Sequence, residues 1–205
     1  SARGAVRFEE QAVADISAAI GILADTAGCD RVYVVGICSG ADHAYRAALS
    51  DRRIAGVVLL DPYSYAYPLA SAFRRIRNAG DGQRWVRAAR KLEGRVLQQV
   101  LHRDERPAAE LTEVVARSRD HQRSAPPLAE FGADLATLAA RGCRIEIVYS
   151  GAVEDDINAA WQFHRLFRSF DFKGNLRVTV WSRIDHTYTE LASQHQLKEL
   201  LLELL

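Results

Sequence analysis

The sequence contains no methionine and only three cysteines, Cys29, Cys38 and Cys143, among its 205 residues. An odd number of cysteines without CxxC or Cys/His ligand spacing argues against a disulfide framework and against a zinc site. Free thiols are typical of a reducing compartment, so a cytoplasmic location is expected. The missing methionine, the initiator included, indicates a processed or truncated chain.

Long apolar runs and an excess of one charge are missing as well. No stretch approaches the roughly 18 apolar residues that span a bilayer, and the first ten residues lack the apolar core of a secretory signal. Lysine and arginine number 27 against 26 aspartates and glutamates, a net charge of +1 that gives no reason to expect nucleic acid as a partner. With 48% hydrophobic residues, the chain is long enough for one globular core.

The hydrophobic pattern predicts a doubly wound α/β fold with a parallel sheet. Residues 8–27 have helical periodicity and are followed by Gly28, a common helix stop. The predicted strands are short runs rich in β-branched residues at 31–38, 55–63, 143–151 and 175–185. Predicted helices occupy 40–50, 157–170 and the leucine-rich C-terminal segment. Strands that alternate with helices favour right-handed crossovers, and the run 31–38 is expected to be buried on both faces.

Residues 64–127 interrupt this alternation. Their pattern is helical, with breaks at NAGDG and ERP and a stop at APP, and basic residues outnumber acidic ones. We interpret them as a basic helical lid inserted into a core formed by residues 1–63 and 128–205; solvated arginine faces are the alternative. Tyr63, Tyr65 and Trp85 are candidates to line an apolar substrate channel, or to pack within the lid. Together with the arginines, they favour an anionic or amphiphilic acyl substrate.

The strongest motif lies where the first predicted strand ends, in VVGICSGA. Gly36, Cys38 and Gly40 form a small-x-nucleophile-x-small pattern that fits a sharp turn from a strand into a helix. Centring the turn on Ser39 would give larger neighbours, so Cys38 is the preferred nucleophile. A helix N-terminus and a nearby imidazole favour the thiolate, and the backbone N–H of Ser39 is a candidate oxyanion donor. The alternative for Cys38 is a buried, inert thiol.

The segment GICSG resembles the nucleophile elbow of the α/β-hydrolase superfamily, in the cysteine form found in dienelactone hydrolases. GICSGAD is also similar to hydrolase-like proteins encoded beside exosortase and exopolysaccharide systems. The resemblance covers nearly the whole chain and implies an α/β-hydrolase-like sheet with a helical lid. It also implies that the histidine after the last strand, His186 in RIDHTY, is the catalytic base. A capping or surface histidine is the alternative.

The acid of a triad has several candidates. The loop SGAVEDDIN offers Asp155, which is preferred, and Glu154; one of its aspartates is expected to cap a helix that starts near Ile157. Asp61, at the end of VVLLDP, is a further candidate because some members of the superfamily take the acid from that earlier strand. A turn-forming aspartate before Pro62 is the other interpretation of Asp61. The order Cys38, Asp155, His186 agrees with the family order.

These features predict an acyl hydrolase that cleaves an ester or thioester through an acyl-cysteine. An acyltransferase with the same triad and a noncatalytic binding or assembly protein are the alternatives. No P-loop, GxGxxG or EF-hand is present, so no cofactor or metal is expected. The resemblance implies that N-terminal strands are missing, which leaves the strand 31–38 at an open edge. The chain is therefore expected to be poorly soluble alone, or to need an N-terminal segment or a homo-oligomer.

Overall fold

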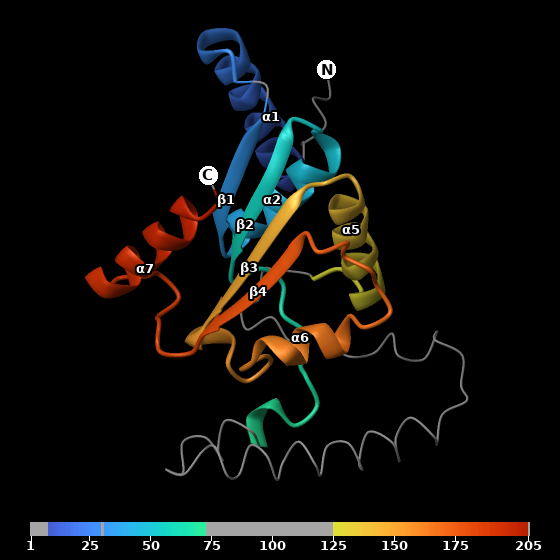
Figure 1. Cartoon of the computed structure of the whole chain (residues 1–205), viewed down its shortest axis with the longest axis vertical. Coiled ribbons are helices and arrows are strands. Elements are labelled where there is room, and N and C mark those ends of the chain that lie inside the picture. The colour runs from blue at the N-terminus through green and yellow to red at the C-terminus, as the bar shows by residue number, and fades with distance from the viewer. Residues whose placement is uncertain (1–7, 30, 73–124, 205) are drawn as a thin grey trace, which may run out of the picture.

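A four-stranded parallel sheet forms the centre of the structure, a computed structural model that describes residues 8–29, 31–72 and 125–204 (Figure 1). The strands are consecutive in the sheet, in the order β1 (Val32–Ile37), β2 (Ile54–Leu60), β3 (Arg144–Ser150) and β4 (Leu176–Trp181). Parallel neighbours need a crossover, and helices α2 (Ser39–Ser50), α5 (Leu128–Ala140) and α6 (Ala160–Leu166) lie between them in the chain. The predicted α/β class is confirmed, and residues 73–124 of the predicted lid lie outside the described part.

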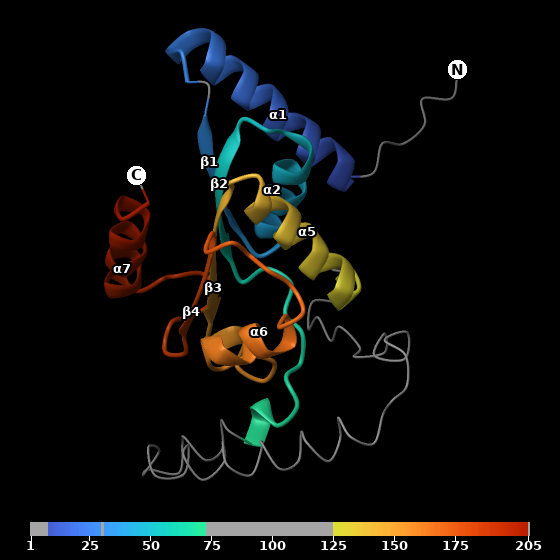
Figure 2. The same ribbon diagram turned by 45° about the vertical axis from the view of Figure 1, so that its right-hand side comes forward.

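Helices cover both faces of the sheet (Figure 2). On one face lie α2, α5, α6 and the N-terminal α1 (Phe8–Ala27), which together bury a large aliphatic and aromatic cluster. On the other face α7 (Leu191–Leu202) packs Leu200 against Val58 and Val148 of the two central strands. The sheet is therefore doubly wound, as predicted. No helix in the described ranges is long and apolar enough to cross a membrane.

β1 is an edge strand, and one of its faces is exposed. Tyr33, Val35 and Ile37 are each between 38% and 47% exposed. Val35 and Ile37 lie beside Val58 and Leu60 in the parallel register, and these two β2 residues pack against α7. Because α7 does not cover β1, the prediction that this strand is buried on both faces is wrong. In the part of the chain that the structure describes, β1 lies at an edge of the sheet, as expected, and the expected low solubility of the isolated chain stays a prediction.

The helix boundaries follow local backbone chemistry. α1 ends where predicted, because Gly28 adopts φ 64° and its N–H donates to the carbonyl of Ala24. The helix predicted to start near Ile157 begins instead at Ala160 and is short. Asn158 precedes it, and its backbone N–H is capped by the side chain of Gln162 at 2.7 Å. The expectation that an aspartate caps this helix is therefore wrong.

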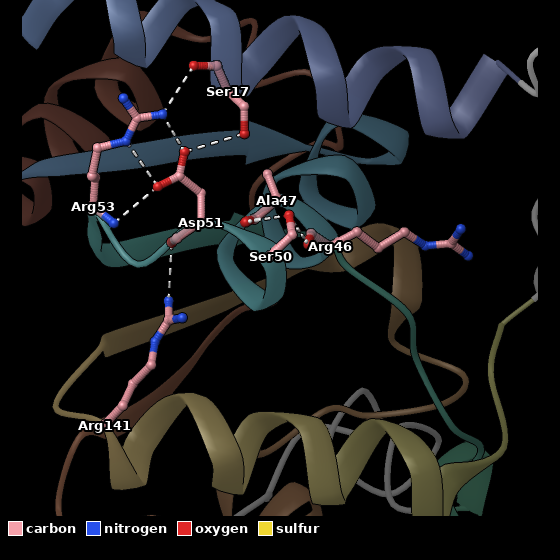
Figure 3. A network of polar contacts seen from close by, with 7 residues as sticks. All are labelled: Ser17, Arg46, Ala47, Ser50, Asp51, Arg53 and Arg141. Carbon is pink, nitrogen blue, oxygen red and sulfur yellow. Dashed lines mark hydrogen bonds and ion pairs between the residues drawn. The ribbon is translucent and has the colours of Figure 1, made fainter.

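A buried carboxylate, that of Asp51, lies between the end of α2 and the start of β2 and also contacts α1 (Figure 3). Asp51 accepts bonds from the Arg53 guanidinium at 2.7 and 3.0 Å and from the Ser17 hydroxyl at 3.2 Å. Arg141, just after α5, reaches the backbone carbonyl of Asp51 at 3.5 Å. The hydrogen bonds from Arg53 lower the pKa of Asp51 from 3.8 to about 2. One ion pair thus fixes the ends of several elements.

Replacing Asp51 by asparagine is expected to lower the free energy of unfolding at pH 7 by about 1 kcal/mol, because the depressed pKa makes the ionised form stabilising. That stabilisation is complete above about pH 4 and is lost as the pH falls through about 2. Urea unfolding of the wild type and of Asp51→Asn at several pH values between 2 and 7 measures the difference. Asp171→Asn, in an exposed pair with Lys173, serves as the control. A difference that does not shrink toward pH 2 would contradict the assignment.

Candidate active site

The turn between β1 and α2 holds Cys38 in a strained conformation. Cys38 has φ 56° and ψ −122°, which for a non-glycine residue costs on the order of 1–3 kcal/mol and is concentrated at functional sites. Its N–H donates to the carbonyl of Leu60 at 2.8 Å, and its own carbonyl accepts from the N–H of Ala41 at 3.0 Å. The side chain is half-buried. The sharp strand-to-helix turn predicted from the sequence is therefore present.

The two glycines around Cys38 have different roles. A Cβ on Gly36 would lie 2.2 Å from the carbonyl oxygen of Gly40 and 2.6 Å from the backbone nitrogen of Ala41. A Cβ on Gly40 would meet no heavy atom within 4 Å among the described residues outside its own turn of helix. The close approach of strand and helix thus requires glycine only at position 36, whereas the sequence pattern suggested that both positions must be small.

Ser39 is the first residue of α2 and is exposed. Backbone N–H groups in the first turn of a helix have no partner within the helix and point out from its positive end. The N–H of Ser39 therefore lies in the turn where the sequence analysis expects an oxyanion donor, next to Cys38.

His186 binds a buried carboxylate at the same edge of the sheet. Its Nδ1 lies 2.7 Å from Oδ2 of Asp61, the residue that directly follows β2 and is 1% exposed. Parallel strands place their carboxyl ends together, and the backbone N–H of Asp61 donates to the carbonyl of Val148 in β3 at 2.8 Å. An ionised carboxylate only accepts, so this contact assigns a proton to Nδ1 of His186, and in the neutral ring Nε2 is then the acceptor.

The carboxylate that contacts Nδ1 of His186 is thus Asp61, which the sequence analysis placed behind Asp155 and Glu154. Asp61 also does more than form a turn before Pro62, because both oxygens of its carboxylate accept hydrogen bonds. In the preferred loop, Asp156 accepts from the hydroxyl of Ser64 at 2.7 Å. The loop between β3 and α6 is therefore hydrogen-bonded to the segment after β2. The strand order favours Asp61, because it follows the strand that lies directly beside β1.

Sequence reasoning overlooked Ser150, the last residue of β3. Its backbone N–H and its hydroxyl both donate to Asp61, each at 2.6 Å. A serine at the carboxyl end of a buried strand carries only a weak sequence signal, since many such residues form turns. What identifies it is the strand order, which brings the ends of β2 and β3 side by side.

The aromatic candidates for substrate contact belong to the core. Tyr63 and Tyr65 are both buried in the cluster on the α2 and α5 face. Tyr65 donates its hydroxyl to the carbonyl of Pro126 at 2.8 Å, and the hydroxyl of Tyr63 accepts from Arg46 at 3.2 Å. Their burial favours packing within the core, the alternative to a substrate channel, and a contact with substrate stays a prediction. Trp85 lies outside the described residues.

A groove of about 520 Å³ runs beside β1 next to the elbow. Its apolar walls come from β1, the start of α2 and α1, and include Val34, Val35, Ile37, Gly40, Ala12 and Ile16. Ile37 directly precedes Cys38 in the chain, so the groove begins close to the candidate nucleophile. Within the described ranges, no cluster of three or more His, Cys, Asp or Glu side chains is arranged to hold a metal ion.

No protein-family model and no curated protein matches the sequence. Among solved structures, the fold is similar to a single-residue variant of the meta-cleavage product hydrolase CumD, with 17% identity over 99% of this chain and 74% of that chain and a TM-score of 0.48. A second CumD variant, from Pseudomonas fluorescens IP01 and complexed with acetates, gives 19% identity over 98% and 73% and a TM-score of 0.46. Alpha/beta hydrolase domain-containing protein 10 from mouse gives 14% identity over 100% and 76% and a TM-score of 0.41. The chemistry proposed below is therefore argued from the residues of this chain, not from these similar structures.

Proposed function

We propose that the chain is an acyl hydrolase that cleaves an ester or thioester, with Cys38 as nucleophile, His186 as general base and Asp61 as the acid that orients the histidine. The observation that carries this proposal is the 2.7 Å contact between His186 Nδ1 and the buried Asp61 carboxylate. It lies at the edge of the sheet where Cys38 occupies its strained turn. A nucleophile, a base and an orienting carboxylate on neighbouring strand ends are the parts that acyl transfer needs.

The reaction follows from these roles. Nε2 of His186 takes the thiol proton of Cys38, and the thiolate attacks the acyl carbonyl carbon. The backbone N–H of Ser39 donates to the oxyanion that forms. When the tetrahedral intermediate collapses, the bond to the leaving alcohol or thiol breaks and the leaving group takes the proton from His186. Water, deprotonated by His186, then attacks the acyl-cysteine carbonyl; the bond between the acyl carbon and Sγ of Cys38 breaks, His186 returns the proton to Cys38, and the carboxylic acid leaves.

The groove beside β1 supports an apolar acyl group as the substrate moiety. Its walls are mainly apolar, with Gln11, Asp15 and His43 also among the lining residues, and burial of a hydrocarbon chain there would contribute roughly 0.8 kcal/mol for each methylene removed from water. We therefore expect esters and thioesters with longer acyl chains to be preferred over acetyl compounds.

Cysteine labelling tests the proposal directly. We expect iodoacetamide at pH 7 to label Cys38 at least about tenfold faster than the exposed Cys29, because the proposed triad brings the His186 imidazole to a thiol at a helix N-terminus, an arrangement that favours the thiolate. Cys143 is buried, and burial raises the pKa of its thiol, so it should label slowest. His186→Ala should remove most of the selectivity for Cys38, and Cys38→Ala should abolish hydrolysis of p-nitrophenyl esters and acyl thioesters. Mass spectrometry of each cysteine peptide gives the rates.

The matched control is His195→Ala, which removes an exposed histidine on α7. This variant should label and hydrolyse like the wild type. If Cys38 labels no faster than Cys29 in the wild type, the turn has the architecture of a nucleophile elbow without its chemistry. In that case a noncatalytic binding protein becomes the better hypothesis.

A further inference from the structure

Ser150 contacts both oxygens of the Asp61 carboxylate. Its backbone N–H donates to Oδ1 and its hydroxyl donates to Oδ2, each at 2.6 Å. Ser150 and Asp61 are 0% and 1% exposed, so water does not compete for these bonds. Two donors from one residue on two oxygens fix the plane of the carboxylate, in the way that a bidentate pair does.

The direction of the Ser150 hydroxyl is itself set by its neighbours. Its oxygen accepts from the backbone N–H of Ala152 at 3.2 Å, at the start of the short 3-10 helix η2 (Gly151–Val153). A hydroxyl has one hydrogen, which is left for Oδ2 of Asp61. The next residue, Gly151, donates its N–H to the carbonyl of Ile184 at 2.9 Å, in the loop that carries His186. The end of β3 is therefore tied to both members of the Asp61–His186 pair.

We propose that Ser150 is a positioning residue: its hydroxyl holds Oδ2 of Asp61 where that oxygen accepts the Nδ1 proton of His186. The inference rests on the proposed function, in which this pair prepares the base. Oδ2 is the oxygen that both the Ser150 hydroxyl and His186 approach, at 2.6 and 2.7 Å. Without the hydroxyl, Oδ2 loses the donor that holds it beside His186, and the plane of the carboxylate is less firmly fixed. The hydrogen bond to His186 then lengthens and the ring loses its fixed orientation.

The test compares Ser150→Ala with Ser150→Thr, which keeps the hydroxyl. The first measurement is the proton NMR signal of the His186 Nδ1–H, which a strong bond to a carboxylate moves downfield and which His186→Ala identifies by its loss. We expect this signal to disappear or move upfield in Ser150→Ala and to persist in Ser150→Thr. The second is the alkylation rate of Cys38, which should fall roughly tenfold in Ser150→Ala and stay within about twofold of the wild type in Ser150→Thr.

The matched control is Ser193→Ala, which removes another buried hydroxyl, donated at 2.6 Å to the carbonyl of Glu190 next to α7. It should change neither the signal nor the rate. An unchanged His186 signal in folded Ser150→Ala would overturn the positioning role, as would its loss from both Ser150 variants while they remain folded. Wild-type Cys38 that labels no faster than Cys29 would overturn the proposed function instead, and the NMR signal would still decide the role of Ser150.

Discussion

Replacing Gly36 by alanine is expected to destabilise the fold by about 3 kcal/mol or more and to remove the selective labelling of Cys38. The added Cβ would lie 2.2 Å from the carbonyl oxygen of Gly40 and 2.6 Å from the nitrogen of Ala41. Both contacts are to the backbone of the first turn of α2, so no side-chain rotation can relieve them. The helix must move away from β1, and overpacking of this kind is costly. Urea unfolding followed by circular dichroism measures the loss, and alkylation reports on the turn.

The matched variant is Gly40→Ala, two residues beyond the nucleophile. A Cβ there meets nothing within 4 Å among the described residues, and alanine is the better helix former by roughly 0.5–1 kcal/mol. We expect Gly40→Ala to be as stable as the wild type or slightly more stable, with Cys38 labelling retained. Equal destabilisation by both substitutions would mean that the turn needs small residues on both sides, as the sequence pattern alone suggests.

Most elements of the sheet could be predicted from the sequence because their signal is local. The run that became β2 is apolar throughout, and all seven of its residues are buried. Gly28 ended α1 for a backbone reason visible in the sequence, the positive φ that glycine adopts easily. Helix α5 was not among the predicted elements. A helix at this position can be inferred from the sheet, because two neighbouring parallel strands need a crossover connection, which is usually a helix.

The exposure of β1 could not be predicted from its composition. A continuous apolar run is typical of strands covered on both faces, but coverage depends on where the remaining helices pack. In this fold α7 packs on β2 and β3 and stops short of β1, so Val35 and Ile37 stay exposed. The apolar composition of a strand is compatible with burial on both faces, but the burial itself depends on which helices pack against the strand.

The candidate site was predictable in part. The residue types and the spacing around Cys38 predicted the turn, and the position of His186 after the last strand followed from the family resemblance. The acid was harder, because three acidic residues in one loop provide no local signal to choose among them. The deciding fact is tertiary: consecutive parallel strands bring the end of β2 next to the end of β3, where Ser150 holds Asp61.

Replacing Asp61 by asparagine is expected to lower the rate of hydrolysis by roughly 10³- to 10⁴-fold, in line with other triads in which the orienting carboxylate becomes an amide. The carboxylate oxygens accept from Ser150 and face Nδ1 of His186, so each of these bonds requires an acceptor on residue 61. An amide offers one acceptor and one donor group. Its NH₂ group must face either a Ser150 donor or the imidazole, and it favours the wrong tautomer of His186. Single-turnover kinetics with an acyl thioester below the melting temperature of the variant measures the effect.

Asp155→Asn is the decisive comparison, because it makes the same chemical change at the acid that sequence reasoning preferred. Asp155 is half-buried in the turn after η2, whereas the contact with Nδ1 of His186 is made by Asp61. We expect Asp155→Asn to retain hydrolysis within about threefold of the wild type, because an exposed or half-exposed charge acts weakly across solvent. The reverse result, a large loss in Asp155→Asn and near-normal rates in Asp61→Asn, would assign the acid to the loop after β3. Asp61 would then hold His186 in the folded chain without taking part in the reaction.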